Sequence, residues 1–179
     1  MDVFSSSNSS FSVVNHRLVG GGVIHVVCEK NRRGLGEPDM IILHYTAGMD
    51  AMSSAKFLVK PDVKASAHVV IGRDGQVIQM VPFNIEAWHA GKSSYGGRSE
   101  LNHYSIGIEL DNLGQLRLEG GKFVAECGKE VLVGEVYTED SGEEPTYWHD
   151  YTDVQMRVLN EVACWWILIP SGISWDIRT

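Results

Sequence analysis

Two titratable side chains stand in apolar runs of this sequence, where a rigid strand would hold each of them in one place. His44 follows the apolar run 40–43, and Glu109 lies within the run 106–110. Four consecutive apolar residues are typical of a strand that is buried on both faces, and α/β proteins place reactive groups where such strands end. We therefore predict that His44 is a metal ligand or a catalytic base at the rim of a sheet, because either role requires a rigid position.

Glu109 is the candidate for proton transfer. A carboxyl group in surroundings of low dielectric constant has a raised pKa, which suits a general base or a general acid. The alternation of the strand leaves a second interpretation open. If Ile106, Ile108 and Leu110 face the core, Glu109 lies on the opposite face and is a surface acid.

The segment 86–101 has no hydrophobic period and is predicted to be a long surface loop, which in a compact domain is usually functional. Aromatic, amide and cationic side chains on or beside it suit a ligand that contains sugar, peptide amides and carboxylates. These candidates for substrate binding are Trp88, His89, Lys92, Arg98 and Asn102. For any one of them, a solvated loop residue is the alternative.

Helices and strands alternate around these residues. Asp50 is a good N-cap for the helix that ends before Pro61, and Thr152 opens a capping box for a helix over 153–167. Strands are predicted at 23–27, 40–43, 67–71, 76–81, 104–110 and 173–179. This alternation indicates an α/β sheet.

The remaining segments are less regular. Residues 1–12 are polar and serine-rich, and we expect a flexible N-terminal tail there. Residues 13–179 are expected to form a single domain, because 179 residues is an ordinary length for one domain. The weak pattern of 122–137 predicts an irregular excursion with one short hairpin.

Composition argues against several classes of protein. The formal net charge is −8 and no basic run occurs, which argues against a nucleic-acid surface. Cys28, Cys127 and Cys164 are too widely spaced for a disulfide framework or a zinc knuckle. No signal peptide and no apolar stretch of membrane-spanning length is visible. We expect a protein that does not insert into membranes and that is cytoplasmic, or is released without an N-terminal signal.

Four segments in order, 41–48, 65–75, 87–91 and 102–110, together resemble the type 2 N-acetylmuramoyl-L-alanine amidase family. The resemblance implies a mixed central β-sheet flanked by helices. It also implies a zinc-dependent hydrolase that cuts the amide bond between N-acetylmuramic acid and L-alanine in peptidoglycan or muropeptides.

The resemblance further implies roles for single residues. His44 is the first zinc ligand, Glu109 is the catalytic carboxylate, and His68 lies beside the site, where it is counted with the substrate-binding residues. In a related branch a tyrosine precedes the position of His68 and serves catalysis. Ala67 stands there in this chain, so Glu109 has to fill that role.

Amide hydrolysis of this kind needs a complete metal site. A zinc ion with three protein ligands and one open position lowers the pKa of its bound water to about 7. The resemblance implies that a histidine, a lysine and an aspartate follow the long helix, and the printed sequence ends at Thr179 before such a segment. We therefore expect the second and third zinc ligands to be missing, with His149 as a weak substitute. The alternative function is a non-catalytic module that binds peptidoglycan or muropeptide.

Overall fold

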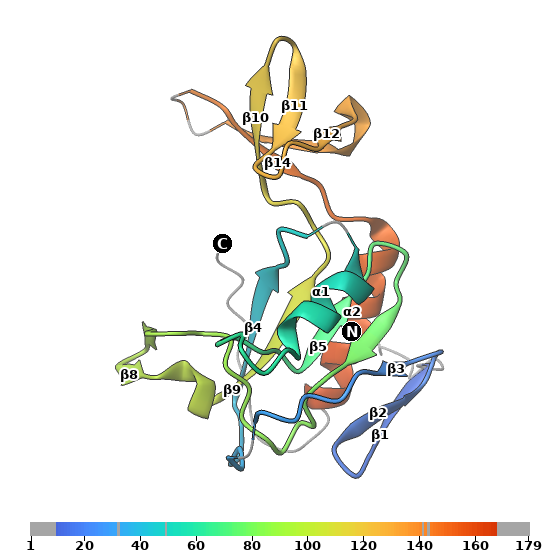
Figure 1. Ribbon diagram of the computed structural model, residues 1–179, viewed down its shortest axis with the longest axis vertical. Helices are drawn as coiled ribbons and strands as arrows, with labels where there is room; N and C mark the ends of the chain where they lie inside the picture. Colours follow the sequence, from blue (N-terminus) through green and yellow to red (C-terminus); the bar gives the residue numbers. More distant parts are fainter. Residues whose placement is uncertain (1–9, 32, 49, 141, 143, 168–179) are drawn as a thin grey trace, which may run out of the picture.

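The computed structural model describes residues 10–167, apart from residues 32, 49, 141 and 143 (Figure 1). The predicted strand at 173–179 lies outside the described residues. In chain order the elements are β1 (Phe11–Val14), β2 (Arg17–Gly20), β3 (Ile24–His25), β4 (Met40–Tyr45), α1 (Ala51–Leu58), β5 (Val69–Ile71), β6 (Val77–Gln79), β7 (Ser94–Tyr95), β8 (Arg98–Ser99), η1 (Leu101–His103), β9 (Ser105–Leu110), β10 (Gln115–Glu119), β11 (Lys122–Ala125), β12 (Glu130–Val131), η2 (Val133–Glu135), β13 (Val136–Glu139), β14 (Thr146–His149) and α2 (Asp153–Ile167).

The main sheet has five strands in the order β3-β6-β5-β9-β4. β9 runs parallel to both of its neighbours, whereas β5 and β6 form an antiparallel pair. Helix α2 and the β1–β2 hairpin pack on one face, and α1 packs on the other, so that each face has its own apolar core (Figure 1). This arrangement confirms the predicted α/β fold with a mixed sheet flanked by helices.

Both helices begin where the sequence predicts. The Asp50 side chain accepts a hydrogen bond from the backbone N–H of Ser53, which caps α1. The hydroxyl oxygen of Thr152 accepts a hydrogen bond from the backbone N–H of Gln155 at the start of α2. The Asp74-Gly75 turn joins β5 to β6, and β3 lies at one edge of the sheet, as the sequence indicates.

The prediction that the run before His44 is buried on both faces was wrong. Among the described strands, β4 is the last one on its side of the main sheet, and Leu43 and Tyr45 are 41% and 44% exposed. The buried strand is β9, which has a hydrogen-bonded neighbour on each side. An apolar run alone does not show how many neighbours its strand has, because pairing depends on segments far away in the chain.

The hairpin at the beginning of the described chain includes two residues that we expected in the flexible tail. Phe11 and Ser12 belong to β1, and Phe11 is buried against Leu18 and helix α2. The apolar ring of Phe11 thus extends the ordered structure into a serine-rich stretch. Residues 1–9 of the expected tail lie outside the described part.

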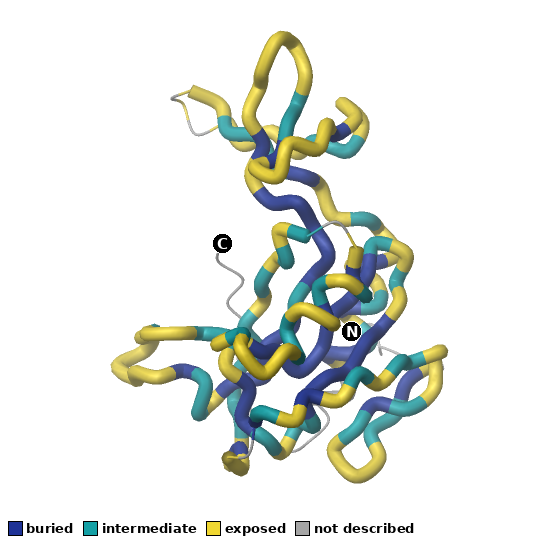
Figure 2. The backbone as a smooth tube through the Cα atoms, viewed as in Figure 1, coloured by how far each residue is buried: buried dark blue, intermediate teal, exposed yellow. Residues whose placement is uncertain are grey.

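A second antiparallel sheet, with the strand order β12-β11-β10-β14-β13, spans residues 115–149. We call it the projecting sheet, because it extends from the end of β9 away from the main sheet (Figure 1). Figure 2 shows that most of its residues are exposed. The short hairpin predicted within 122–137 is present, as β11 paired with β12. The rest of that segment is less irregular than predicted, because β11 also pairs with β10 and β13 pairs with β14.

The described chain contains no helix that is long and apolar enough to cross a membrane.

Candidate active site

The parallel pairing of β4 with β9 places the two leading candidates side by side. His44 is the register partner of Glu109, so both side chains leave the same face of the main sheet. The core-facing residues of β9 are on the other face, which means that the alternation argument located Glu109 correctly. It lies on the face opposite the α2 core, but it is only partly exposed.

Burial changes the chemistry of Glu109. Desolvation raises the pKa of its carboxyl group to about 7. Within the described residues, its carboxylate has no hydrogen bond and no ion pair that would lower the pKa again. A half-buried acid with a pKa near neutral can accept and return a proton, as general acid–base catalysis requires.

A second histidine lies directly over β9. The ring of His89 covers Gly107, where a Cβ atom would come within 2.3 Å of the ring. His89 Nδ1 lies 3.1 Å from His44 Nε2, and His89 Nε2 lies 3.3 Å from Ser105 Oγ. Patterns in the sequence did not single out Gly107 or Ser105 as site residues. The glycine between two isoleucines was the available signal, because a missing side chain in a strand often marks a close approach.

His68 lies deeper on the same face. Its side chain is fully buried, Nδ1 accepts a hydrogen bond from the N–H of Gly107, and Nε2 lies 3.0 Å from the Ile85 carbonyl. Burial lowers the pKa of His68 to about 4 and contributes most to lowering that of His89 to about 3. Both rings are therefore neutral near pH 7. His68 leaves no ring nitrogen free for a substrate, which corrects its place among the substrate-binding candidates.

The loop after β6 is fastened beside these histidines. Asn102 Oδ1 accepts hydrogen bonds from the N–H groups of His89 and Ala90, and the Ser66 hydroxyl accepts one from the N–H of Trp88. The ring of Trp88 remains 39% exposed. Asn102 thus holds the loop in place, whereas Trp88 presents an aromatic surface to solvent.

The outer part of the loop carries the cationic candidates. Arg98 Nη1 contacts both carboxylate oxygens of Asp39 at 2.6 Å, and its guanidinium lies 5.1 Å from the centre of the Tyr104 ring. Lys92 is exposed and lines an open hollow of about 390 Å³ with Ser93, Ser94, Ser99 and Glu100. Of the two cations, Lys92 is the one without a protein partner in the described part.

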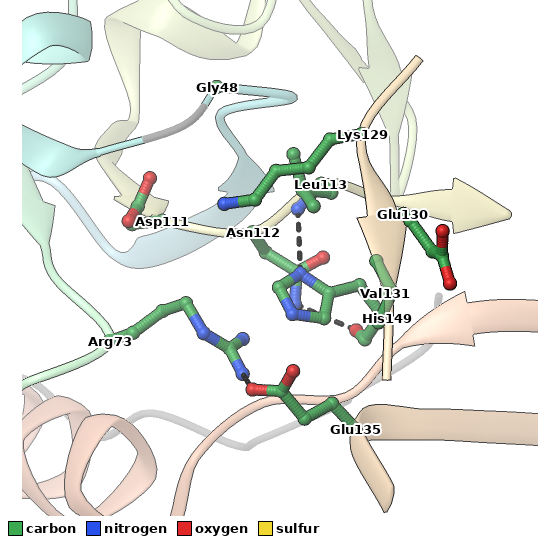
Figure 3. A pocket seen from close by; sticks show the side chains of 10 residues that line it. All are labelled: Gly48, Arg73, Asp111, Asn112, Leu113, Lys129, Glu130, Val131, Glu135 and His149. Carbon is green, nitrogen blue, oxygen red and sulfur yellow. Dashed lines mark hydrogen bonds and ion pairs between the residues drawn. The ribbon is translucent and has the colours of Figure 1, made fainter. Parts of the chain in front are cut away.

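A more enclosed cavity of about 90 Å³ lies elsewhere, between the main and projecting sheets (Figure 3). We call it the joint cavity. Its lining residues are Gly48, Arg73, Asp111, Asn112, Leu113, Lys129, Glu130, Val131, Glu135 and His149. Neither His44 nor Glu109 lines this cavity, so the candidate site is an open face of the sheet and not the enclosed pocket.

His149 belongs to the joint cavity and not to the histidines over β9. Its Nδ1 accepts a hydrogen bond from the N–H of Leu113, and burial lowers its pKa to about 4. Within the described residues no three His, Cys, Asp or Glu side chains converge to hold a metal ion. His149 therefore does not complete a site with His44, and the described residues alone do not fit a catalytic zinc ion.

A family profile described as N-acetylmuramoyl-L-alanine amidase matches residues 34–175. The 1,6-anhydro-N-acetylmuramyl-L-alanine amidase AmpD of Citrobacter freundii is 46% identical over 67 residues, which cover 37% of this chain and 36% of the relative. The N-acetylmuramoyl-L-alanine amidase AmiD of Escherichia coli strain K12 is 37% identical over 93 residues, or 48% of this chain and 33% of AmiD. The matches thus span about a third of the length of these relatives.

A solved structure agrees with the fold. The crystal structure of a selenomethionine AmpD derivative superposes with a TM-score of 0.51 at 25% identity, and the match covers 84% of this chain and 75% of that one.

Proposed function

Because the chain belongs to the N-acetylmuramoyl-L-alanine amidase family, we propose that it hydrolyses the amide bond between N-acetylmuramic acid and L-alanine, with Glu109 as the general base. The observation that carries this proposal is the position of Glu109. It is a half-buried carboxylate with a pKa of about 7 and with no hydrogen bond or ion pair to another described residue, and it lies next to His44 across two parallel strands.

Glu109 has two tasks in this proposal. It accepts a proton from the water that attacks the scissile carbonyl, and it then delivers that proton to the departing amine of L-alanine. A carboxyl group with a pKa near 7 performs both transfers at neutral pH, whereas an ordinary glutamate would be too weak a base. Positioned acid–base groups typically contribute a factor of about 10² to 10⁴ to the rate.

Zinc remains a requirement that has to be tested. The family's chemistry uses a zinc-activated water, and we assign His44 as one donor to the ion. A catalytic zinc site has three protein ligands, and the described residues supply only this one. No step of the reaction is therefore assigned to zinc here.

For substrate binding we propose the exposed side chains of the loop. Trp88 offers an aromatic surface for a sugar ring, and Lys92 and Arg98 offer positive charge for stem-peptide carboxylates. Asn102 and His89 support the loop that carries them. The name of the Citrobacter relative specifies a 1,6-anhydro-N-acetylmuramyl substrate, so anhydro-muropeptides are the first substrates to assay.

The decisive experiment combines turnover with metal content. The 179-residue protein is dialysed mildly, its zinc is measured by elemental analysis, and release of the L-alanine amino group from an anhydro-muropeptide is followed with and without added zinc. We expect zinc-dependent release that is lost in His44→Ala. Zinc-independent turnover, or zinc binding that His44→Ala leaves unchanged, would contradict the assigned role of His44.

A second function is favoured by the absence of a three-ligand site among the described residues. A module that binds muropeptide without cleaving it needs only the loop around Trp88 and Lys92. Saturable binding of an anhydro-muropeptide without amine release, at any zinc concentration, would replace the amidase proposal with this one.

A further inference from the structure

A row of side chains crosses the projecting sheet on the face opposite its small core. Leu116 and Tyr147 are register partners, and both pack with Phe123 in that core. Because side chains alternate along a strand, the neighbouring pair of Gln115 and Trp148 points to the opposite face. The indole of Trp148 is therefore turned away from the core that holds the sheet together.

Tyr137 extends this row onto a third strand. It is the register partner of Trp148 in the antiparallel pair β13–β14, so the two side chains stand next to each other on the same face. Tyr137 is 56% exposed, and Trp148 is partly buried. The indole N–H of Trp148 donates to the Thr146 hydroxyl over 3.2 Å, which restrains the orientation of this ring.

Tyr45 connects the row to the candidate active site. It follows His44 at the end of β4, and its ring meets that of Trp148 edge-on, with the two ring centres 6.4 Å apart. The Tyr45 ring also lies against the backbone of Gly114, where a Cβ atom would overlap it. The glycine thus leaves the space that the ring occupies, while 44% of Tyr45 stays exposed.

Tyr151 brings a fourth aromatic ring close to the proposed catalytic carboxyl. Burial raises the pKa of the Tyr151 phenol most, and the nearby Tyr45 and Glu109 raise it further. Tyr151 is exposed at the surface. Aromatic side chains therefore continue from the neighbourhood of Glu109 onto the projecting sheet. We call this set the aromatic strip, and its members are Tyr45, Tyr137, Trp148 and Tyr151.

The chemistry of the aromatic strip suits a chain of sugar rings. A pyranose ring has a face of C–H groups that packs on an aromatic ring, and its hydroxyl and acetamido groups require hydrogen-bond partners around it. Such partners border the strip. Gln115 stands beside Trp148, and Glu139 stands on the same face one pair beyond Tyr137. Flat apolar rings with polar groups between them are what a sugar chain needs.

The charge of the projecting sheet argues against other partners. Residues 115–150 contain nine Asp and Glu residues and only three Lys and Arg residues. An acidic surface of this kind repels anionic lipid headgroups and nucleic acids. The polar side chains between the rings are also unlike the continuous apolar groove that binds an amphipathic helix. An uncharged sugar chain meets neither obstacle.

We propose that the aromatic strip binds the glycan chain beside the muramic acid residue whose amide bond is cleaved. The position of the strip next to the candidate active site is the observation that carries this proposal. The identity of the sugars as N-acetylhexosamines rests on the proposed amidase function. A muropeptide that keeps part of its glycan chain is then a better substrate than a muropeptide with a single sugar.

The first test measures glycan binding without turnover. The linear tetramer of N-acetylglucosamine is titrated into the ¹⁵N-labelled 179-residue protein, and the indole N–H signal of Trp148 is followed by NMR. We expect a saturable shift of this signal. Tyr137→Ala should weaken the binding about tenfold, because an aromatic contact is lost, and Tyr137→Phe should keep the affinity of the wild type.

The matched control for this titration is Phe57→Ala. Phe57 is 54% exposed, close to the 56% of Tyr137, and it lies on helix α1 away from the strip. Its removal should leave the affinity for the tetramer unchanged. An unshifted Trp148 signal, or equal losses of affinity in Tyr137→Ala and Phe57→Ala, would overturn the proposal.

The second test compares two substrates that carry the same peptide. Amine release from a tetrasaccharide muropeptide and from its single-sugar counterpart gives two values of kcat/KM. Their ratio should exceed one in the wild type and fall about tenfold in Trp148→Ala, mainly through a higher KM for the longer substrate. Tyr137→Ala, at an exposed position, makes the same comparison if Trp148→Ala unfolds the projecting sheet. An unchanged ratio in the folded variants would overturn the proposal.

Two further outcomes separate this proposal from its alternatives. If the tetramer binds at Trp148 and no amine is released from any muropeptide, glycan binding stands and the amidase proposal fails. If amine is released and the tetramer does not bind, the amidase proposal stands and the glycan proposal fails. Concentration-dependent dimers that Tyr137→Ala abolishes would instead assign the strip to a second copy of this chain.

Discussion

The main sheet and the projecting sheet are built on different principles. Each face of the main sheet buries an extended apolar core, and β9 between them has three core residues that are at most 2% exposed. The projecting sheet buries only a small cluster around Leu113, Leu116, Ala125 and Val131. The candidate catalytic groups lie in the more tightly packed main sheet, and a raised carboxyl pKa and an ordered histidine pair both require a rigid, desolvated setting.

Several polar contacts join the two sheets. The Arg73 guanidinium donates to the Asp150 carbonyl at 2.7 Å. It also forms an ion pair with Glu135 at 3.3 Å (Figure 3). The Asn112 side chain donates to the His149 carbonyl at 2.8 Å. Because such contacts exchange readily with water, we expect the projecting sheet to open locally before the main sheet unfolds.

The largest expected effect is on catalysis and is confined to the main sheet. Glu109→Gln removes the proposed base, and we expect kcat for anhydro-muropeptide to fall by a factor of about 10² to 10⁴. Glu135→Gln changes a carboxylate at the joint and should alter kcat less than about twofold, as expected for a group that takes no part in proton transfer. Steady-state amine release measures kcat for both variants. Equal losses of kcat in Glu109→Gln and Glu135→Gln would contradict the assignment of proton transfer to Glu109.

Glu109→Gln should also stabilise the folded protein at alkaline pH. Folding raises the pKa of the Glu109 carboxyl from 4.5 to about 7. The wild type therefore loses stability as pH rises from 4.5 to about 7, because the half-buried carboxyl must then ionise within the folded protein. Allowing for partial exposure, the variant should gain about 1–2 kcal/mol at pH 8. Urea unfolding at pH 5 and pH 8 tests this, and a variant without a gain at pH 8 would show that Glu109 is better solvated.

Shortening one core side chain in each sheet should show that the two sheets unfold independently. Ile108→Ala in β9 should lower the global free energy of unfolding by about 2–5 kcal/mol. Val131→Ala in the projecting sheet should instead speed amide hydrogen exchange within 115–149, with little change in the urea midpoint of the main sheet. A common loss of protection across both sheets in Val131→Ala would mean that they unfold as one unit.

The buried histidines should make the main sheet sensitive to acid. Burial lowers the pKa of His68 from 6.5 to about 4, so the unfolded chain takes up this proton first and stability is lost as pH falls from about 6.5 toward 4. His68 alone should account for about 2–3 kcal/mol of that loss. The slope of stability against pH, measured by urea unfolding, should be shallower in His68→Gln, whatever its stability at pH 8.

The smallest effect on stability is expected from the ion pair between the main sheet and the projecting sheet. Arg73→Ala removes a partly exposed ion pair, which typically contributes at most about 1 kcal/mol. Amide exchange in the projecting sheet should rise, and the protection of β9 should stay the same. If Arg73→Ala lowered the free energy of unfolding of the main sheet by several kcal/mol, the contacts between the two sheets would be shown to stabilise the whole fold.

Local features of the sequence determined where the two helices begin and where one tight turn lies. Caps at Asp50 and Thr152 predicted both helices, and the Asp74-Gly75 pair predicted the turn between two strands, because each depends on neighbours only a few residues away. The resemblance over 41–110 predicted the family and the fold. It also singled out His44 and Glu109, whose positions side by side on one face the structure then showed.

Pairing between distant segments decided the rest. The run before His44 has the pattern of a buried strand, yet β4 is half-exposed because it has a neighbour on one side only among the described strands. The weakly patterned segment 122–137 became part of a five-stranded sheet because β10, which precedes it, pairs with β14, which follows it. His89 came to lie over Gly107 only when a loop folded back across β9. Strand neighbours, register and the environment of a side chain are set by long-range packing, which sequence patterns of short range do not encode.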